Sequence, residues 1–337
     1  MILDKLFRSN FFFLTLILTL FSCDNSDNVK INGFTMGSTY EITIRNFEGS
    51  SEKIKIEFDS LLTEINNVFS TYQNSSEISK INNLKKNQID ISDRFNYVLN
   101  KSLYYCDLSG GTYDITIGPL VELWGFGKSK SIGIPSKETI DNHIKNIGFF
   151  NIYIKDKTLY KNINDISIDL NSIAKGYAVD EIALLIESKG YSDFLVEIGG
   201  EIKSSIKNSN NWIVGIHDPS SNSIYQNGVI KKILLNNKSM ATSGTYNNYF
   251  LHNGKKLSHI INPKTGYPFN YSTVSATVIA SDCIDADAFA TMAMTMEVDE
   301  FLSIINNQED VEALLFIIGD DNELIYYESE NFKEFIY

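Results

Sequence analysis

Residues 167–177 constrain this chain most, because they predict a strand that leads directly into a helix. Apolar residues recur at helical spacing over 173–189, and Gly190 follows as a stop signal. The first turn of this helix carries Lys175, although a lysine there opposes the helix dipole. A phosphate bound at the helix N-terminus would account for that charge. A capped helix with a solvated lysine is the plain alternative.

The rest of the pattern interleaves helices with short strands. Helices are expected over 54–69, 94–106, 137–147, 286–296 and 298–305. Strands are expected over 34–44, 194–198, 212–217, 230–235, 274–280, 314–318 and 324–327, with a hairpin centred on Asp156-Lys157. Neither a GxGxxG loop after a strand nor a GxxxxGK[ST] loop occurs. The expected fold class is therefore α+β, with mixed, largely antiparallel sheets and packed helices, rather than a doubly wound parallel sheet.

The N-terminal residues are typical of an export signal. Lys5 and Arg8 precede an apolar run over 11–21 that is too short to span a bilayer as a mature helix. Ser22-Cys23 resembles a bacterial lipoprotein cleavage site. We therefore expect a signal peptide over 1–23, lipid on Cys23 and a polar tether over 24–32, which anchors the protein at the cell membrane, facing the periplasm or exterior. An ordinary secretory signal and an uncleaved anchor are the alternatives.

Charge and cysteine content exclude some classes of function. The net charge is −13 and no long basic stretch interrupts it, so nucleic acid is not an expected partner. Apart from Cys23, the cysteines are Cys106 and Cys283, which form neither a CxxC motif nor a ligand cluster. A disulfide is conceivable in an exported protein. Two buried thiols are expected instead, because each cysteine lies in apolar or helical sequence.

A metal site is suggested by Asp287 and Thr291. They are four residues apart, so on a helix their side chains share one face. A carboxylate and a hydroxyl are hard oxygen ligands that suit Mg²⁺, with water and phosphate completing its shell. The alternative is structural: acidic residues favour the start of a helix, and a threonine hydroxyl can bond back to its own turn.

Turns near His259 suggest a second functional region. His259 is expected at a strand end, before a turn that contains Pro263 and Gly266. A histidine there is well placed for proton transfer near neutral pH, although a surface histidine is the alternative. Backbone N–H groups of residues 264–266 are candidates for holding phosphate. Residues 240–246 are expected to form a turn of small residues that a ligand can approach closely.

Together these segments form an ordered set that resembles the ApbE family, the FAD:protein FMN transferases, from about Gly33 to near the C-terminus. The matching blocks are residues 35–40, 70–72 with 76–82, 111–127, 169–180, 197–201, 241–244, 259–268 and 287–291. Departures are mild: Asn262 replaces a usual aspartate, Glu201 replaces a frequent aspartate, and residues 171–172 vary a pair of small residues.

The resemblance implies an ApbE-like, T-fold-related domain over 33–337. It implies an Mg²⁺-dependent enzyme that transfers FMN from FAD to a threonine or serine of an acceptor protein, a membrane redox subunit, and releases AMP. The implied FAD site comprises Met36, Tyr72, Thr112, Tyr113, Asp114, Asp169, Lys175 and His259. The implied metal ligands are Asp287, Thr291 and Ser172, the last through its carbonyl. His259 is expected to act as the base or to orient the hydroxyl, and Lys175 to neutralise phosphate charge.

Two alternatives remain open at this point. In the first, the same site hydrolyses FAD to FMN and AMP, with water as the nucleophile. In the second, the chain is a flavin-binding lipoprotein without turnover. Release of AMP separates the enzymes from the binding protein, and modification of an acceptor separates the transferase from the hydrolase.

Overall fold

The computed structural model describes residues 28–127, 133–207, 209–220, 228–245, 249–252, 255–269, 272–319, 321 and 323–337. The expected signal peptide, including the proposed lipidation site at Cys23, lies outside the described residues. Within the described part, none of the helices combines the length and apolar character needed to cross a bilayer.

One eight-stranded sheet organises the molecule, and every neighbouring pair of its strands is antiparallel. The α+β class with largely antiparallel sheets is therefore confirmed. In spatial order the strands are β1 (Val29–Thr35), β2 (Ser38–Ile44), β6 (Phe194–Ile198), β7 (Glu201–Ser205), β10 (Ser239–Gly244), β13 (Thr273–Ala280), β14 (Glu312–Ile318) and β15 (Leu324–Glu328).

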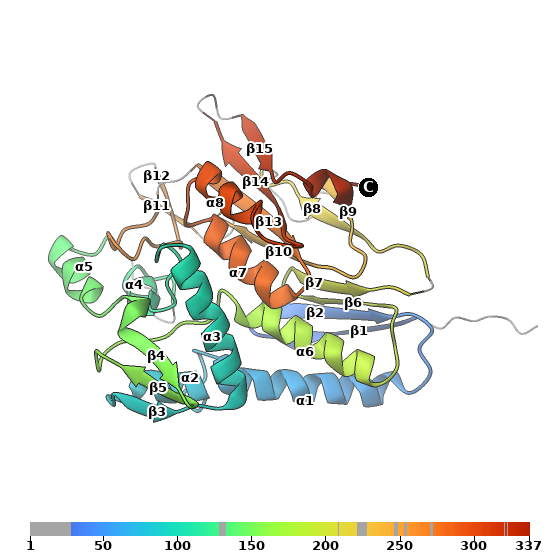
Figure 1. Cartoon of the computed structure of the whole chain (residues 1–337), viewed down its shortest axis with the longest axis horizontal. Helices are drawn as coiled ribbons and strands as arrows, with labels where there is room; N and C mark the ends of the chain where they lie inside the picture. Colours follow the sequence, from blue (N-terminus) through green and yellow to red (C-terminus); the bar gives the residue numbers. More distant parts are fainter. Residues whose placement is uncertain are drawn as a thin grey trace, which may run out of the picture.

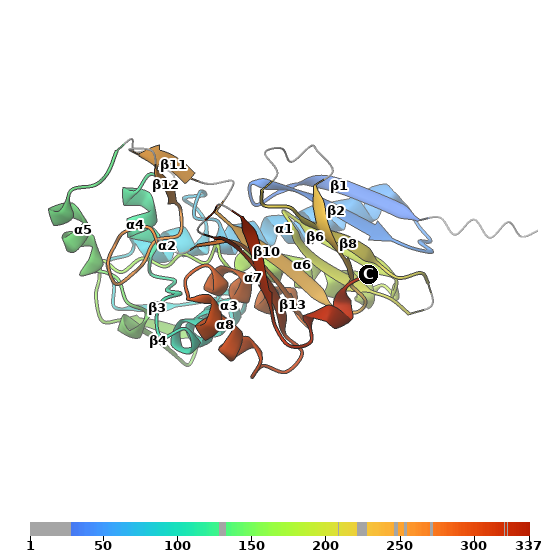
Figure 2. The ribbon, with the colours of Figure 1, turned by 90° about the horizontal axis from the view of Figure 1, so that it is seen from above.

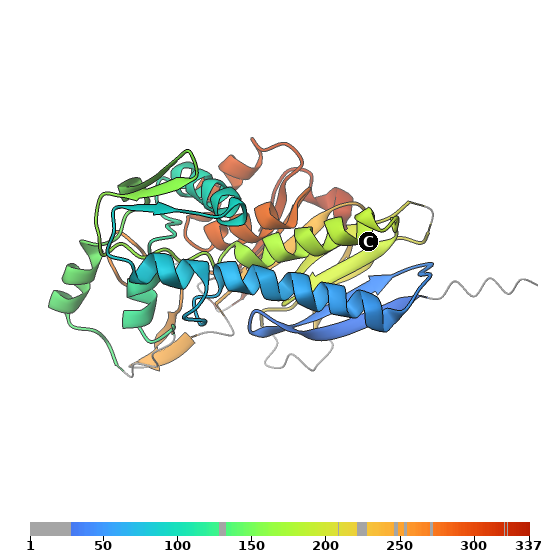
Figure 3. The same ribbon diagram turned by 90° about the horizontal axis from the view of Figure 1, so that it is seen from below.

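Helices cover one face of this sheet, and Figure 3 shows two of them, α1 and α6, running along it together. The helices that pack on this side are α1 (Ser51–Phe69), α3 (Asp93–Leu108), α6 (Ala174–Ser188), α7 (Cys283–Ala293) and α8 (Val298–Ile305) (Figure 1). Their core includes Val278 and Leu315, whereas the adjacent Ile279 and Leu314 belong to the other face. This alternation is the two-residue period of a sheet that is buried on both sides.

The opposite face is covered by a hairpin and the C-terminal turn. The hairpin consists of β8 (Ile213–His217) and β9 (Val229–Leu234), and the turn is η2 (Phe332–Phe335). Ile216, Ile233 and Phe332 pack there against Met240 and Phe316 of the sheet. In Figure 2, β8 lies over the region of β6.

Smaller elements gather beyond one end of the large sheet (Figure 1). They include a three-stranded sheet whose β4–β5 hairpin turns at Asp156 and Lys157, as expected. A third apolar cluster joins Leu120 and Trp124 to Ile140 and Ile261. The elements here are α2 (Glu77–Asn83), β3 (Gln88–Asp90), α4 (Gly118–Leu123), α5 (Lys137–Ile144), η1 (Phe149–Asn151), β4 (Ile152–Lys155), β5 (Thr158–Lys161), β11 (Tyr249–His252) and β12 (Lys255–Ser258).

The single strand expected over 34–44 is wrong, because the segment belongs to the β1–β2 hairpin. Met36 and Gly37 form its turn, and both have positive φ, 49° and 76°. The expected tether over 24–32 is also too long, since β1 begins at Val29, which pairs with Ile44. Phe34 has the same even spacing as Tyr40, Ile42 and Ile44, so the sequence pattern did not show the break, but the two-residue turn shifts the buried face by one position and leaves Phe34 72% exposed.

Two further expectations need correction. Residues 167–170 precede α6 as predicted, but they form no strand. Their backbone is held differently: the side chain of Asn82 bonds both N–H and C=O of Ile168, and Asp169 N–H donates to the carbonyl of Ile115. The small-residue turn expected over 240–246 is, as far as Gly244, the sheet strand β10. Ala241 belongs to the core on the helix side, and Ser243 lies against Thr291 of α7.

Candidate active site at the junction of α6 and α7

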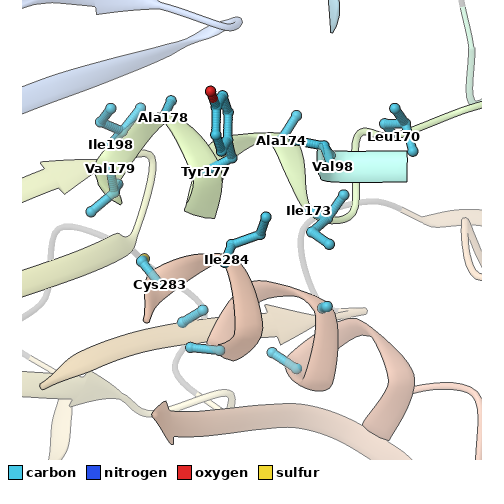
Figure 4. Packing of buried hydrophobic residues seen from close by; sticks show 14 of the residues in the cluster. Val98, Leu170, Ile173, Ala174, Tyr177, Ala178, Val179, Ile198, Cys283 and Ile284 are labelled. Carbon is cyan, nitrogen blue, oxygen red and sulfur yellow. The ribbon is translucent and has the colours of Figure 1, made fainter. Parts of the chain in front are cut away.

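The site is built on an unusually close contact between α6 and α7. A Cβ atom on Gly176 would lie 2.3 Å from the carbonyl oxygen of Cys283 and 2.8 Å from Cβ of Asp287. Only glycine permits that approach, so α6 brings its first turn directly against the start of α7. Figure 4 shows the surrounding apolar contacts, with Ile173, the residue before α6, and Ile284 of α7 lying between the two helices.

Asp287 lies at this contact as a buried carboxylate. Its Oδ2 accepts a hydrogen bond of 2.9 Å from the backbone N–H of Gly176, in the first turn of α6. Burial raises the pKa of Asp287 to about 8; the charge of Glu201 adds to the rise, and Lys175 opposes it. The helix N-terminus thus meets an anion as expected, but in this structure the anion is a side chain of α7.

Lys175 forms an ion pair with Glu201. Burial disfavours the lysine charge, but the carboxylates of Glu201 and Asp287 outweigh that effect and raise the pKa of Lys175. The second oxygen of Glu201, Oε2, has no hydrogen-bond partner among the described residues. When Glu201 and Asp287 are both ionised, their two negative charges exceed the one positive charge of Lys175, and the local charge of −1 favours the binding of a cation.

The other expected metal ligands flank this group. Thr291 follows Asp287 by one turn of α7, and its hydroxyl lies 3.2 Å from that of Ser243 on β10. Ser172 precedes α6, and its hydroxyl is hydrogen-bonded at 2.7 Å to that of Tyr113. The pKa of Tyr113 is raised by burial, with further contributions from the charges of Cys106, Asp287 and Asp169. Tyr113 therefore lies close enough to both Asp287 and Asp169 for their charges to affect its pKa.

Thr112 and Asp114 shape the loop that carries Tyr113. Thr112 is half-buried, and its hydroxyl lies 3.2 Å from that of Thr295. Asp114 is buried, and it accepts bonds from the N–H and hydroxyl of Thr116 and from the N–H of Phe149. Burial raises the pKa of Asp114, and these bonds oppose the rise. The carboxylate of Asp114 thus fixes the loop.

Two cavities adjoin at Asn171, in the segment before α6, and neither is lined by a residue of α6 or α7. The smaller, of about 240 Å³, is lined by Tyr72, Phe126 and Asp169 among others. The larger, of about 870 Å³, is lined by Met36 and again by Tyr72. Asn171 also borders both. Burial raises the pKa of Asp169, which accepts a 2.8 Å bond from the N–H of Asn171. The structure therefore places Met36, Tyr72 and Asp169 around two cavities that share part of their lining.

His259 directly follows β12, as expected. Its ring lies edge-on to Phe126, with 6.1 Å between the ring centroids, so it neighbours the smaller cavity through Phe126. The following turn is fixed to the fold because Trp124 donates a 2.7 Å bond from Nε1 to the carbonyl of Gly266.

The turn after His259 does not offer its first N–H groups to phosphate. Asn262 Oδ1 accepts bonds from the N–H groups of Lys264 and Thr265, at 2.8 and 3.2 Å. Gly266 N–H donates to the carbonyl of Asn262 at 2.8 Å. The suggestion that residues 264–266 hold phosphate is therefore wrong. Asn262 thus caps this turn with its side-chain oxygen, an acceptor that an aspartate carboxylate would also offer.

The donor set fits a magnesium ion. Asp287 supplies a buried carboxylate, and a bound cation would oppose the rise in its pKa by favouring the ionised form. Thr291 and Ser172 add neutral oxygens, and Mg²⁺ commonly uses few protein ligands and retains water. No cluster of three or more histidine, cysteine, aspartate or glutamate side chains suited to a metal occurs in the described residues. The set thus suits Mg²⁺ better than Zn²⁺.

Gly176 and Asn82 are site-building residues that the sequence reasoning did not single out. Gly176 permits the helix contact, and Asn82 holds the segment before α6 at Ile168. A glycine inside an apolar helical pattern signals close packing, so Gly176 carried a usable signal. Asn82 carried none, since its contact spans 86 residues. Cys106 and Cys283 are buried free thiols, as expected.

Known proteins resemble this chain over most of its length. A profile of the ApbE family matches residues 36–315. The FAD:protein FMN transferase of Vibrio cholerae is 35% identical over 328 residues, covering 95% of this chain and 96% of the relative. That of Escherichia coli K12 is 30% identical over 315 residues, covering 91% and 88%.

Solved structures show the same architecture. The flavin transferase ApbE from Vibrio cholerae superposes with a TM-score of 0.83 and 33% identity, over 92% of this chain and 99% of that one. The apo form of Pseudomonas stutzeri flavinyl transferase ApbE gives a TM-score of 0.82 at 27% identity, over 91% and 96%.

Proposed function

This chain belongs to the ApbE family and is an FAD:protein FMN transferase, and we propose that it carries out the transfer at the junction of α6 and α7. The observation that carries this placement is the buried carboxylate of Asp287 against the first turn of α6, beside Lys175. A lysine and a carboxylate that can bind a cation together can neutralise the charge of a pyrophosphate.

The reaction exchanges one phosphoester partner for another. The oxygen of an acceptor serine or threonine forms a bond to the FMN phosphorus of FAD, and the bond from that phosphorus to the bridging oxygen breaks. AMP leaves with the bridging oxygen, and the proton of the acceptor hydroxyl is lost to a base. The products are AMP and an acceptor that carries FMN through a phosphoester.

Mg²⁺ is proposed to bind to Asp287, Thr291 and the carbonyl of Ser172. When bound, it would supply positive charge to the pyrophosphate oxygens as the phosphorus–oxygen bond breaks. Glu201 holds Lys175 in place by its ion pair, and Gly176 keeps Asp287 oriented by its N–H. Lys175 is proposed to contribute a second positive charge toward the same phosphates.

The flavin nucleotide is proposed to occupy the smaller cavity and the adjoining part of the larger one. Tyr72 is 66% exposed and borders both cavities, so its ring is available for stacking. Met36 and Asp169 add one apolar and one polar wall. Thr112, Tyr113 and Asp114 belong to the loop beside Ser172, where Tyr113 supplies the contact.

His259 is proposed to accept the proton of the acceptor hydroxyl or to orient that hydroxyl. Its place beside Phe126, at the edge of the smaller cavity, supports this role. We further propose that Cys23 carries the lipid anchor and that the acceptor is a membrane redox subunit. The amino-terminal sequence pattern supports the anchor.

The test is a transfer assay on the purified full chain with FAD, Mg²⁺ and a candidate acceptor. Intact-mass analysis of the acceptor should show the gain of one FMN group, and AMP should appear in equal amount. An acceptor whose serine and threonine candidates are replaced by alanine is the matched control. AMP release without modification of any acceptor would instead favour FAD hydrolysis.

A further inference from the structure

The larger cavity extends well beyond the residues assigned to the flavin nucleotide. Its lining includes Lys55, Asp59, Thr63 and Asn66 of α1, opposite the turn of the β1–β2 hairpin at Met36. Lys55 and Asn66 are eleven positions apart, which corresponds to about 16 Å along a helix. None of the residues proposed for FAD or Mg²⁺ lies on α1. Most of this groove is therefore left for another molecule.

The groove is connected to the site at one end. Tyr72 and Asn171 line both the groove and the smaller cavity, where Asp169 is found. A chain lying along α1 would thus arrive at the flavin nucleotide beside Tyr72. The transfer reaction needs such a route, because its second substrate is a side-chain hydroxyl of a folded or extended polypeptide.

The walls of the groove have the chemistry of a polypeptide-binding surface. Lys55 and Asp59 are its charged residues, and they pair with each other at 2.9 Å, so the lining carries no net charge. Thr63, Asn66 and Gln73 offer hydrogen-bonding groups. Phe34, 72% exposed on the hairpin, supplies an apolar contact. Such a lining suits an extended segment of small polar and apolar residues rather than a strongly charged one.

The strand that forms one wall is also the terminal strand of the large sheet. β1 contributes Phe34 and Thr35 to the lining, and in the described sheet only β2 pairs with it. Terminal strands present main-chain N–H and C=O groups that an extended peptide can use.

We propose that the groove between α1 and the β1–β2 hairpin binds the acceptor protein, as an extended segment of low charge that leads its serine or threonine to the flavin phosphate beside Tyr72. This inference rests on the proposed transfer reaction. A segment of about five residues would span the 16 Å of groove along α1.

The test places a bulky side chain in the middle of the groove. Thr63 is an exposed residue of α1, so Thr63→Trp should fold, and Ser60→Trp is the matched control on an exposed position outside the lining. Thr63→Trp should lower kcat/KM for the acceptor at least tenfold, mainly through KM. Its Kd for FAD, measured by flavin fluorescence, should match that of the wild type. Ser60→Trp should change neither quantity.

A second measurement detects binding without turnover. A benzophenone amino acid at position 63 should crosslink to the acceptor close to its modified residue, whereas the same group at position 60 should not. Equal loss of FAD affinity in Thr63→Trp would make the groove a nucleotide subsite and overturn the proposal. Unchanged transfer, or equal crosslinking from both positions, would also overturn it. Failure of the wild type to transfer FMN would instead contradict the proposed reaction, while crosslinking would still report on the groove.

Discussion

At the scale of single residues, Asp287 combines a buried position with a charge that the proposed chemistry needs. Asp287→Asn keeps an oxygen that can accept the N–H of Gly176 but removes the charge. We expect affinity for Mg²⁺ to fall at least tenfold and transfer to fall by orders of magnitude, while the protein stays folded. Calorimetric titration with Mg²⁺, the transfer assay and circular dichroism measure the three quantities. Full wild-type activity in EDTA would count against any role for a metal.

His259 gives a second prediction at this scale. His259→Ala should slow FMN transfer by about 10²–10⁴-fold, the usual contribution of a positioned base. FAD should still bind, because Met36, Tyr72 and Asp169 line the cavities independently. Single-turnover rates and an FAD titration on the same sample separate the two effects. A variant that transfers at the wild-type rate would remove His259 from the mechanism, and one that loses FAD affinity equally would make it a binding residue.

Lys161 gives a prediction about stability and pH. Its side chain is buried, Nζ donates to the carbonyls of Ile81 and Ile166, and burial lowers its pKa to about 8. Between pH 8 and 10.5 the unfolded chain retains a proton that the folded protein has lost, so this residue makes stability rise with pH. From pH 8 to pH 10.5, the unfolding free energy of the wild type should therefore rise relative to that of Lys161→Met by about 1–3 kcal/mol. Urea titrations at both pH values measure it, and a constant difference would contradict the assignment.

The residue scale was the most predictable part of the site. Asp287 and Thr291 share a helix, and His259 follows a strand, as their spacing indicated. Lys175 was singled out for its charge, but its ion pair with Glu201 depends on a strand that begins 26 positions later. Such partners are set by tertiary contacts, which spacing along the chain does not contain.

At the scale of elements, the contact between α6 and α7 depends on Gly176 having a hydrogen atom where other residues have Cβ. Gly176→Ala would place Cβ 2.3 Å from the carbonyl oxygen of Cys283, so the two helices must separate. We expect a loss of about 1–3 kcal/mol, as for other overpacked contacts, and a matching loss of transfer because Asp287 shifts from α6. Leu184→Ala, on the exposed side of α6, serves as control. Unchanged stability and transfer in Gly176→Ala would show that the contact is not needed.

Element types were largely predictable, but their ends and connections were less so. Helices α1 and α8 and strand β6 follow from apolar periodicity and fall close to the expected residues. The β1–β2 turn was missed because Met36 is not a typical residue for positive φ. Residues 167–170 look like a strand but bond to Asn82 and Ile115, which are remote in sequence. The hydrophobic pattern of a segment indicates that it is buried, but it does not indicate which groups form hydrogen bonds with its backbone.

At the scale of the whole molecule, the antiparallel class followed from the alternation of hairpins and helices, whereas strand order did not. β10 lies between β7 and β13 because long connections leave and rejoin the sheet. Nothing in the local pattern of residues 239–244 distinguishes a central strand from a turn.

The anchor gives a prediction for the intact protein. Cys23→Ser should block lipid attachment, so the protein should move from the membrane fraction to the soluble fraction or change in processing. The catalytic domain is unaffected, so transfer to a soluble acceptor fragment should persist at the wild-type rate. Wild-type protein recovered wholly soluble, with an unmodified Cys23 or a different mature N-terminus, would contradict the proposal.

With Cys23 lipidated as proposed, the position of Val29 at the start of β1 would set how far this enzyme can work from a membrane. Only residues 24–28 separate Cys23 from the sheet, and a linker of this length reaches roughly 20 Å at full extension. From Val29, the seven residues of β1 lead away to Met36 at the site, a further distance of about 23 Å. With Cys23 lipidated, β1 would act as a rigid spacer, joined to the lipid by this short linker. The enzyme would then search for acceptors by lateral diffusion, and would modify only sites presented within a shallow layer above the lipid.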